Sequence, residues 1–174
     1  TGATVVTRDN VEIFLKDQAS VQPEEAEAVM NQIMQGDATE AQIGAYLMGL
    51  RMKGETQSEI IGSARAMRAN AAKVPTSANG DLLDTCGTGG DARNTFNVST
   101  ATALVSAAMG IPVAKHGNRS ASSRCGSADV LEALGIELPE DERAAAECLR
   151  ETGFTFLFAP HFHPAMARLA PVRR

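Results

Sequence analysis

Hydrophobic positions in the first third of the chain recur every three or four residues, the spacing of one buried helix face. Four such stripes occur, and each follows residues typical of a helix start: Asp9 with Glu12, Pro23, Thr39 with Gln42, and Thr56 with Glu59. Gly36 and Gly54 mark the ends of the second and third stripes. The pattern predicts four short helices whose apolar faces form a bundle core and carry no chemistry.

A segment rich in Pro, Ser and Gly at 73–81 separates this region from one in which hydrophobic residues follow a different pattern. Beyond it, short apolar runs predict strands at 82–86, 111–115 and 154–159, with helices at 98–109, 127–134 and 139–151. This alternation is typical of a parallel sheet with right-handed crossovers. The expected fold class is α/β: a small helical domain at 1–72, a linker at 73–81, and the first part of a parallel-sheet domain at 82–174.

The expected sheet looks incomplete. Three parallel strands leave open edges, and the sequence stops at Arg174 just as a further helix is under way. We therefore expect the α/β domain to be truncated.

Composition and charge exclude several classes of protein. The 174 residues carry a net charge of −5, whereas non-specific nucleic-acid binders usually carry a basic surplus. No apolar run approaches membrane-spanning length, and the N-terminus lacks the pattern of a signal peptide. The three cysteines, Cys86, Cys125 and Cys148, form neither a disulfide framework nor a metal-ligand spacing. We expect a cytoplasmic protein with no nucleic-acid or membrane partner.

The first candidate site is the glycine-rich loop at 84–91 (DTCGTGGD), directly after the first expected strand. Three glycines in four positions let the backbone approach a ligand and turn its amides inward. The following helix offers free N–H groups to phosphate, and Asn97, Ser99 and Thr100 at its start can cap it or bind a ligand. The loop is neither a Walker A loop nor a dinucleotide-binding loop. A tight turn with ordinary caps is the alternative; the hydroxyl groups favour phosphate.

The second candidate site is the loop at 115–124 (KHGNRSASSR), again directly after a strand. Ligands of open α/β sheets bind beyond the carboxyl ends of the strands, so both loops should face one crevice. Lys115, Arg119 and Arg124 concentrate positive charge, and nearby serines add donors, a combination suited to a polyphosphate. Solvated loop charges are the alternative. His161 and His163 lie two apart, but no third metal ligand is in view, so helix-start and substrate-lining roles are favoured.

Six blocks resemble, in order, the signature motifs of the anthranilate phosphoribosyltransferase family: GTGGD at 87–91, NVST at 97–100, KHGNR at 115–119, GSADVLEALG at 126–135, FLFAPHFHPAM at 156–166 and APVRR at 170–174. The resemblance implies transfer of the phosphoribosyl group from phosphoribosyl pyrophosphate to the amine of anthranilate, a step of tryptophan biosynthesis. It also implies Mg²⁺ as cofactor and a homodimer formed through the helical domain.

The resemblance assigns residues to each substrate. Phosphoribosyl pyrophosphate would be bound by Gly87, Gly90, Asp91, Thr95, Asn97, Val98, Ser99, Thr100, Lys115, Gly117, Arg119, Ser122, Ser123 and Ser127. Anthranilate would be bound by Gly87, His116, Asn118, His163 and Arg173, with Arg173 suited to the carboxylate. Ser99 would be one Mg²⁺ ligand. His116 is a candidate base, and no other catalytic residue is assigned.

In the family, an Asp-Glu pair needed for Mg²⁺ follows these blocks, so residues 1–174 alone are expected to be inactive. Two alternatives remain. A pyrimidine nucleoside phosphorylase resembles this family in architecture, but KHGNR and Arg173 favour the transferase. A noncatalytic relative that binds nucleic acid is expected to have a basic groove and to lack the glycine-loop motif. In this sequence the GTGGD motif is intact.

Overall fold

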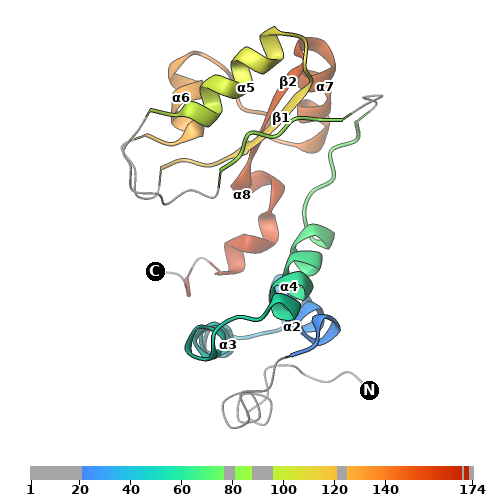
Figure 1. Cartoon of the computed structure of the whole chain (residues 1–174), viewed down its shortest axis with the longest axis vertical. Coiled ribbons are helices and arrows are strands. Elements are labelled where there is room, and N and C mark those ends of the chain that lie inside the picture. Colours follow the sequence, from blue (N-terminus) through green and yellow to red (C-terminus); the bar gives the residue numbers. More distant parts are fainter. Residues whose placement is uncertain (1–20, 77–80, 88–95, 121–124, 170, 173–174) are drawn as a thin grey trace. The chain divides into compact units, whose positions relative to one another are not determined.

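The computed structural model describes residues 21–76, 81–87, 96–120, 125–169 and 171–172 (Figure 1). The chain divides into two compact units, one of residues Thr1–Ala71 with Ala165–Arg174, the other of Ala72–Pro164. Within the first unit, Leu169 is buried in the helical core. The domain boundaries at 72, 81 and 82 stay a prediction.

The helical unit contains α2 (Pro23–Gln35), α3 (Glu40–Lys53) and α4 (Gln57–Ala69), and the 3₁₀ helix Pro164–Leu169 runs into it. The predicted caps form. The amide of Thr39 donates to Gln42 at 2.9 Å, and that of Thr56 to Glu59 at 2.8 Å. Gly36 ends α2 in the left-handed conformation, at φ 87°. The helix expected after Asp9 lies outside the described residues.

The core of this unit lies between the apolar faces of the helices. Val29, Ile33, Ile43 and Leu50 are buried in it. Gly62 allows α4 to approach α2 closely, since a Cβ there would lie 2.8 Å from the Cβ of Ala26. One acidic side chain is also buried. Glu59 is 1% exposed.

The α/β unit is built on two parallel strands, β1 (Val113–Gly117) and β2 (Phe154–Phe158), paired from Val113↔Phe154 to Gly117↔Phe158. On the other edge of β1, Leu83 forms a single bridge: its N–H donates to Pro112 at 2.9 Å, and its carbonyl accepts from Ala114 at 3.0 Å. The strand expected at 82–86 is therefore wrong in length. The reason is local, because the Asp84 carboxylate accepts the N–H of Cys86 and bends the chain out of the ladder.

Helices α5 (Val98–Ala108), α6 (Ser127–Ala133), α7 (Glu142–Thr152) and α8 (Ala159–Phe162) complete this unit. Alternate strand residues serve two cores, as the pleat requires. Phe154 and Phe156 pack with Leu131, whereas Leu157 packs with Phe162. Helix α7 begins three residues later than expected, because Asp141 caps it by accepting the N–H of Ala144. The expected fold class, a helical region followed by a parallel-sheet α/β region, is confirmed.

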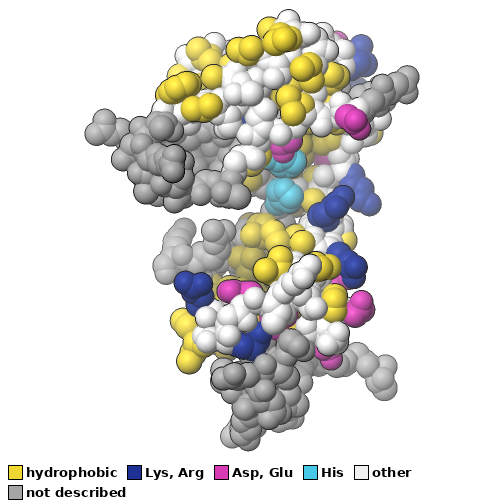
Figure 2. All heavy atoms as spheres, in the orientation of Figure 1, with side chains coloured by type: hydrophobic (Ala, Val, Ile, Leu, Met, Phe, Trp, Pro, Cys, Tyr) yellow, Lys and Arg dark blue, Asp and Glu magenta, His cyan; other side chains and the backbone are white. Residues whose placement is uncertain are grey.

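The face of α5 that is not packed on the sheet is apolar. Val105 is 59% exposed and Met109 is 75% exposed, and Figure 2 shows hydrophobic side chains gathered over this helix. Its other face packs on the sheet through Ala103. Among the described residues, none of the helices has both the length and the apolar character needed to cross a bilayer.

Candidate functional site

The chain after Leu83 and the end of β1 lie side by side, as expected for neighbouring parallel strands. One carboxylate joins them. Asp84 Oδ1 accepts the N–H of Cys86 at 2.8 Å and that of His116 at 3.3 Å, and its Oδ2 lies 2.9 Å from His116 Nδ1. The His116 and Asp84 side chains are 40% and 38% exposed, so solvent and ligands can reach both. The two sequence motifs therefore meet at Asp84 and His116.

Lys115 is the buried cation of this region, at 1% exposure. Its Nζ donates to Ser99 Oγ in the first turn of α5 and to the carbonyl of His116, both at 3.3 Å. Burial lowers the pKa of Lys115 from its usual range, and the neighbouring Cys86 and Asp84 act in the opposite direction. The geometry thus places an ammonium group at the start of a helix, where anions are favoured.

The first turn of α5 carries further polar groups. Thr85 Oγ1 donates to the carbonyl of Ser99 at 2.8 Å, which fixes this turn against the segment before the glycine loop. Thr100 is 1% exposed, and its hydroxyl has no hydrogen-bond partner within the described part of the chain. Asn97 does not cap α5; its amide donates to the carbonyls of Cys125 and Gly126 at 3.4 and 3.3 Å.

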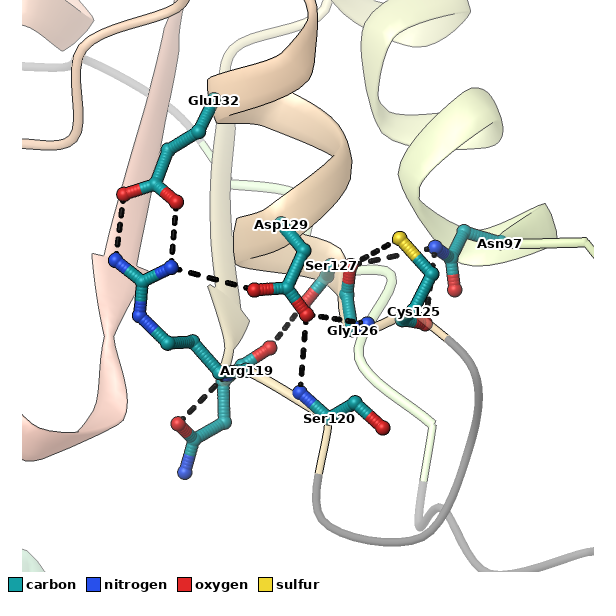
Figure 3. A network of polar contacts seen from close by, with 9 residues as sticks. Asn97, Arg119, Ser120, Cys125, Gly126, Ser127, Asp129 and Glu132 are labelled. Atoms are coloured by element: carbon teal, nitrogen blue, oxygen red, sulfur yellow. Dashed lines mark hydrogen bonds and ion pairs between the residues drawn. The ribbon is translucent and has the colours of Figure 1, made fainter.

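In the described part of the predicted cationic loop, Arg119 pairs with acidic side chains of α6 (Figure 3). Arg119 donates to Glu132 of α6 through two hydrogen bonds of 2.5 and 2.6 Å, and to Asp129 at 3.3 Å. Asp129 in turn accepts the N–H groups of Ser120 at 3.2 Å and Gly126 at 2.8 Å. Neither acid was among the site residues expected from the sequence. Asp129 had a local signal, because an acid three residues after Gly126 is the usual partner for free N–H groups at a helix start.

Asn118 and Ser127 lie within the same network. The Asn118 carbonyl accepts from Ser127 Oγ at 3.3 Å and from the N–H of Ala128 at 3.2 Å. Gly117 permits this close approach, since a Cβ there would meet Ser127 Oγ and would lie 2.5 Å from the Phe156 ring. The end of β1 is therefore packed directly against the start of α6.

The histidines divide into a pair and a single residue. The rings of His116 and His163 have centroids 5.7 Å apart and are tilted by 32°. Burial, and to a smaller extent His116, lowers the pKa of His163 from its usual value. The His161 ring instead lies edge-on to the Phe158 ring, with the two centroids 5.1 Å apart. Over the described ranges, no group of three or more His, Cys, Asp or Glu side chains could hold a metal ion.

Several predicted ligands cannot be placed. Those outside the described residues are Gly90, Asp91, Thr95, Ser122, Ser123 and Arg173. The structure brings Lys115 together with Ser99, and His116 together with His163. Gly87 is exposed, and a Cβ there would meet none of the described atoms within 4 Å.

Comparison with known proteins defines the class. The helical bundle domain of the glycosyl transferase family matches residues 15–71, and the a/b domain of that family matches residues 79–174. The chain belongs to this glycosyl transferase family. Within it, the chain is 53% identical to the anthranilate phosphoribosyltransferase of Herpetosiphon aurantiacus over 162 residues, which is 93% of this chain and 47% of that protein. It is 57% identical over 150 residues to the enzyme of the same name from Chloroflexus aurantiacus, which is 86% of this chain and 44% of that protein.

Solved structures of proteins with the same name also resemble this chain. A crystal structure of the anthranilate phosphoribosyltransferase from Thermus thermophilus is 46% identical, with a TM-score of 0.84 over 94% of this chain and 49% of that one. The Saccharomyces cerevisiae enzyme in complex with PRPP and Mg shares the fold, at 24% identity and a TM-score of 0.81 over 97% of this chain and 52% of that one. The resemblance inferred from six sequence blocks is confirmed. The chain spans about half the length of the curated relatives it matches.

Proposed function

We propose that the protein carrying this chain transfers the phosphoribosyl group of phosphoribosyl pyrophosphate to the amine of anthranilate, giving N-(5-phosphoribosyl)anthranilate and pyrophosphate. The observation that carries the proposal is the placement of Lys115, whose buried ammonium group contacts Ser99 in the first turn of α5. The relatives named above, together with a yeast structure of the same name that holds PRPP and Mg, support the choice of substrate.

The pyrophosphate end of the donor would lie at the start of α5. Lys115 supplies positive charge there, the free N–H groups of the helix add hydrogen bonds, and Gly87 leaves the backbone open to a ligand. The unpaired Thr100 hydroxyl is a further donor within the described region. Asn97, Val98, Gly117 and Ser127 are further members of the predicted donor-binding set. The set also includes Arg119 and the residues Gly90, Asp91, Thr95, Ser122 and Ser123.

Magnesium fits this position in one respect. The Ser99 hydroxyl is a hard oxygen donor of the kind that Mg²⁺ accepts, and phosphate oxygens of the ligand would supply others. A yeast relative was solved with PRPP and Mg. When bound with pyrophosphate, Mg²⁺ would reduce the charge on the leaving group.

Anthranilate would lie near His116, His163 and Asn118. Arg173 is proposed to pair with its carboxylate, since a guanidinium binds a carboxylate through two parallel hydrogen bonds. His116 and His163 offer aromatic surface and ring nitrogens on one side of the sheet end.

The reaction breaks the bond between C1 of the ribose and a pyrophosphate oxygen, and forms a bond from C1 to the amine nitrogen. The amine loses one proton, for which His116 is the candidate acceptor. Lys115 would stabilise the negative charge that develops on the departing pyrophosphate. Since the amine is already unprotonated at neutral pH, correct positioning supplies most of the acceleration. Homodimerisation through the helical unit and a cytoplasmic location stay predictions.

The test is a direct assay with a matched variant. The protein is incubated with anthranilate, phosphoribosyl pyrophosphate and Mg²⁺, and the product is measured by mass spectrometry. Lys115→Met keeps the buried stem but removes the charge, so kcat/KM for phosphoribosyl pyrophosphate should fall about 10- to 100-fold. Product formation that is unchanged in a folded Lys115→Met protein would contradict the proposal. Phosphorolysis of a pyrimidine nucleoside without transfer to anthranilate would favour the nucleoside phosphorylase alternative.

A further inference from the structure

Arg119, which the resemblance assigns to the pyrophosphate, pairs with two acidic side chains of α6 in the structure (Figure 3). Two of its nitrogens bind the two carboxylate oxygens of Glu132, and one of these nitrogens also binds Asp129. The guanidinium carbon lies 5.6 Å from the centre of the Phe158 ring. One positive and two negative charges meet here, so the cluster carries a net charge of −1 when all three groups are ionised.

A surplus of negative charge is a poor environment for a pyrophosphate. A guanidinium has five N–H donors in a fixed plane, and three of its hydrogen bonds already go to carboxylates. A phosphate that bound the remaining N–H groups of Arg119 would have to lie beside the carboxylates of Glu132 and Asp129. The Lys115 ammonium group, by contrast, donates to a hydroxyl and a carbonyl, with the carboxylate of Asp84 nearby.

Asp129 holds the chain on both sides of this arginine. Its Oδ2 accepts the N–H of Ser120 at 3.2 Å and that of Gly126 at 2.8 Å. These N–H groups, followed by Arg119, lower the pKa of Asp129, which is therefore charged at neutral pH. Gly126 has no room for a side chain, because a Cβ would lie 2.5 Å from the Arg119 carbonyl carbon.

The consequence reaches two proposed substrate ligands. Asn118 adjoins Arg119 and accepts the Ser127 hydroxyl through its carbonyl, and its side chain accepts the N–H of Arg119 at 2.7 Å. Movement of Arg119 or of α6 would therefore shift Asn118 and Ser127 together. Asn97 couples the same corner to α5 through the carbonyls of Cys125 and Gly126.

We propose that Arg119 and Asp129 are positioning residues: Arg119 braces the end of β1 against Glu132 of α6 and does not bind pyrophosphate, while Asp129 fixes Ser120 and Gly126. The inference rests on the proposed function, since it concerns how that site is held. It differs from the motif-based assignment in giving the arginine an internal acidic partner.

A double-mutant cycle distinguishes a positioning role of Arg119 from direct binding of pyrophosphate. KM for phosphoribosyl pyrophosphate and for anthranilate is measured in Arg119→Ala, Glu132→Ala and the double variant. If Arg119 acts through Glu132, the two single variants should raise both KM values by a similar factor, about two- to fivefold, and the double variant should be no worse than either. Arg150→Ala, which removes another exposed arginine paired with a glutamate at 2.9 Å, is the control and should match the parent protein.

A different pattern overturns the proposal. If Arg119 binds pyrophosphate, Arg119→Ala should raise KM for phosphoribosyl pyrophosphate more than tenfold with little change for anthranilate, while Glu132→Ala stays near the parent value. An additive double variant would lead to the same conclusion, because it would show two independent roles.

Asp129 is tested without any substrate. In Asp129→Asn, amide exchange at Ser120 and Gly126 should accelerate several-fold, whereas amides within α7 should not change. Equal protection in the parent and variant proteins would refute the role of Asp129. Calorimetry in which the parent protein does not bind phosphoribosyl pyrophosphate would instead refute the proposed function and leave this amide measurement valid.

Discussion

Asp84 Oδ2 lies 2.9 Å from His116 Nδ1, and the other oxygen of the same carboxylate accepts the backbone N–H of His116. One acid therefore fixes both the ring and the main chain of the residue that follows Lys115. Because Asp84 also accepts the N–H of Cys86, it connects the start of the glycine loop to the end of β1. A carboxylate in this place orients the ring and selects the nitrogen that holds the proton.

The first prediction concerns that proton. With Asp84 present, neutral His116 should carry its proton on Nδ1, which leaves Nε2 free to accept one from a substrate. Asp84→Ala should shift the population toward the Nε2-protonated form, as read from imidazole ¹⁵N chemical shifts. His161 is the internal control, since its ring contacts Phe158. An Nδ1-protonated His116 in both proteins would mean that Asp84 does not set the tautomer.

The second prediction concerns His163. Burial lowers its pKa, and the neighbouring His116 lowers it further. His116→Gln removes only the second cause, so the pKa of His163 should rise but stay below 6.5, the value of an unperturbed histidine. Proton NMR titration of the ring measures this. A pKa that does not move in a folded variant would contradict the electrostatic contribution of His116.

The same shift has a consequence for stability. The folded protein holds fewer protons on His163 than the unfolded chain does, since the folded pKa is depressed. The contribution of His163 to the free energy of unfolding is therefore fully present above pH 6.5 and is lost as the pH falls through the folded pKa.

The third prediction concerns Glu59 in the helical unit. Its carboxylate accepts the N–H groups of Val21 at 3.2 Å and Thr56 at 2.8 Å, and the Lys53 ammonium group at 2.9 Å. Glu59→Ala should lower the free energy of unfolding by about 3 kcal/mol, because two N–H groups lose this acceptor and the nearly buried Lys53 loses the carboxylate it pairs with. Chemical denaturation measures the loss, with the exposed Glu55→Ala as control. Equal losses in both variants would contradict this role of Glu59.

The effect should depend on pH. Burial alone would raise the pKa of Glu59, but its hydrogen bonds to Thr56, Lys53 and Val21 outweigh burial and lower it from 4.5. Its contribution is therefore present above pH 4.5 and is lost as the pH falls through the depressed value. Tyr46 reports on the same charge, since burial, with the charge of Glu59 adding to it, raises the pKa of Tyr46 to about 12.

The sequence predicted the elements well where local chemistry determines them. Helix starts at Pro23, Thr39 and Thr56 follow from caps and periodicity, and these depend on residues three or four apart. The strand at 82–86 could not be judged in this way, because its length depends on a long-range ladder with β1 and on the side chain of Asp84. Likewise, the motif identified Lys115 as a candidate site cation, but its burial depends on long-range packing and could not be predicted.

Arg119 shows why composition of a loop does not fix its role. Its sequence position among other cations suggested phosphate, whereas the acids that neutralise it come from α6, ten and thirteen residues later. Asp129 and Glu132 lie three apart on that helix, so both can face one guanidinium. The pairing depends on which helix follows the loop and on which face of that helix packs against the end of β1.

The last prediction concerns two glycines of the site region that have opposite surroundings. At Gly117 a Cβ would meet Ser127 Oγ and would lie 2.5 and 2.6 Å from atoms of the buried Phe156 ring, whereas at Gly87 it would meet none of the described atoms within 4 Å. Gly117→Ala should therefore lower the free energy of unfolding by about 1–3 kcal/mol, since neither the ring nor the start of α6 can withdraw without disturbing the core. Gly87→Ala should leave it nearly unchanged. Urea denaturation followed by circular dichroism compares the two, and Gly117→Ala that is as stable as the parent would show that α6 can move away from β1 at little cost.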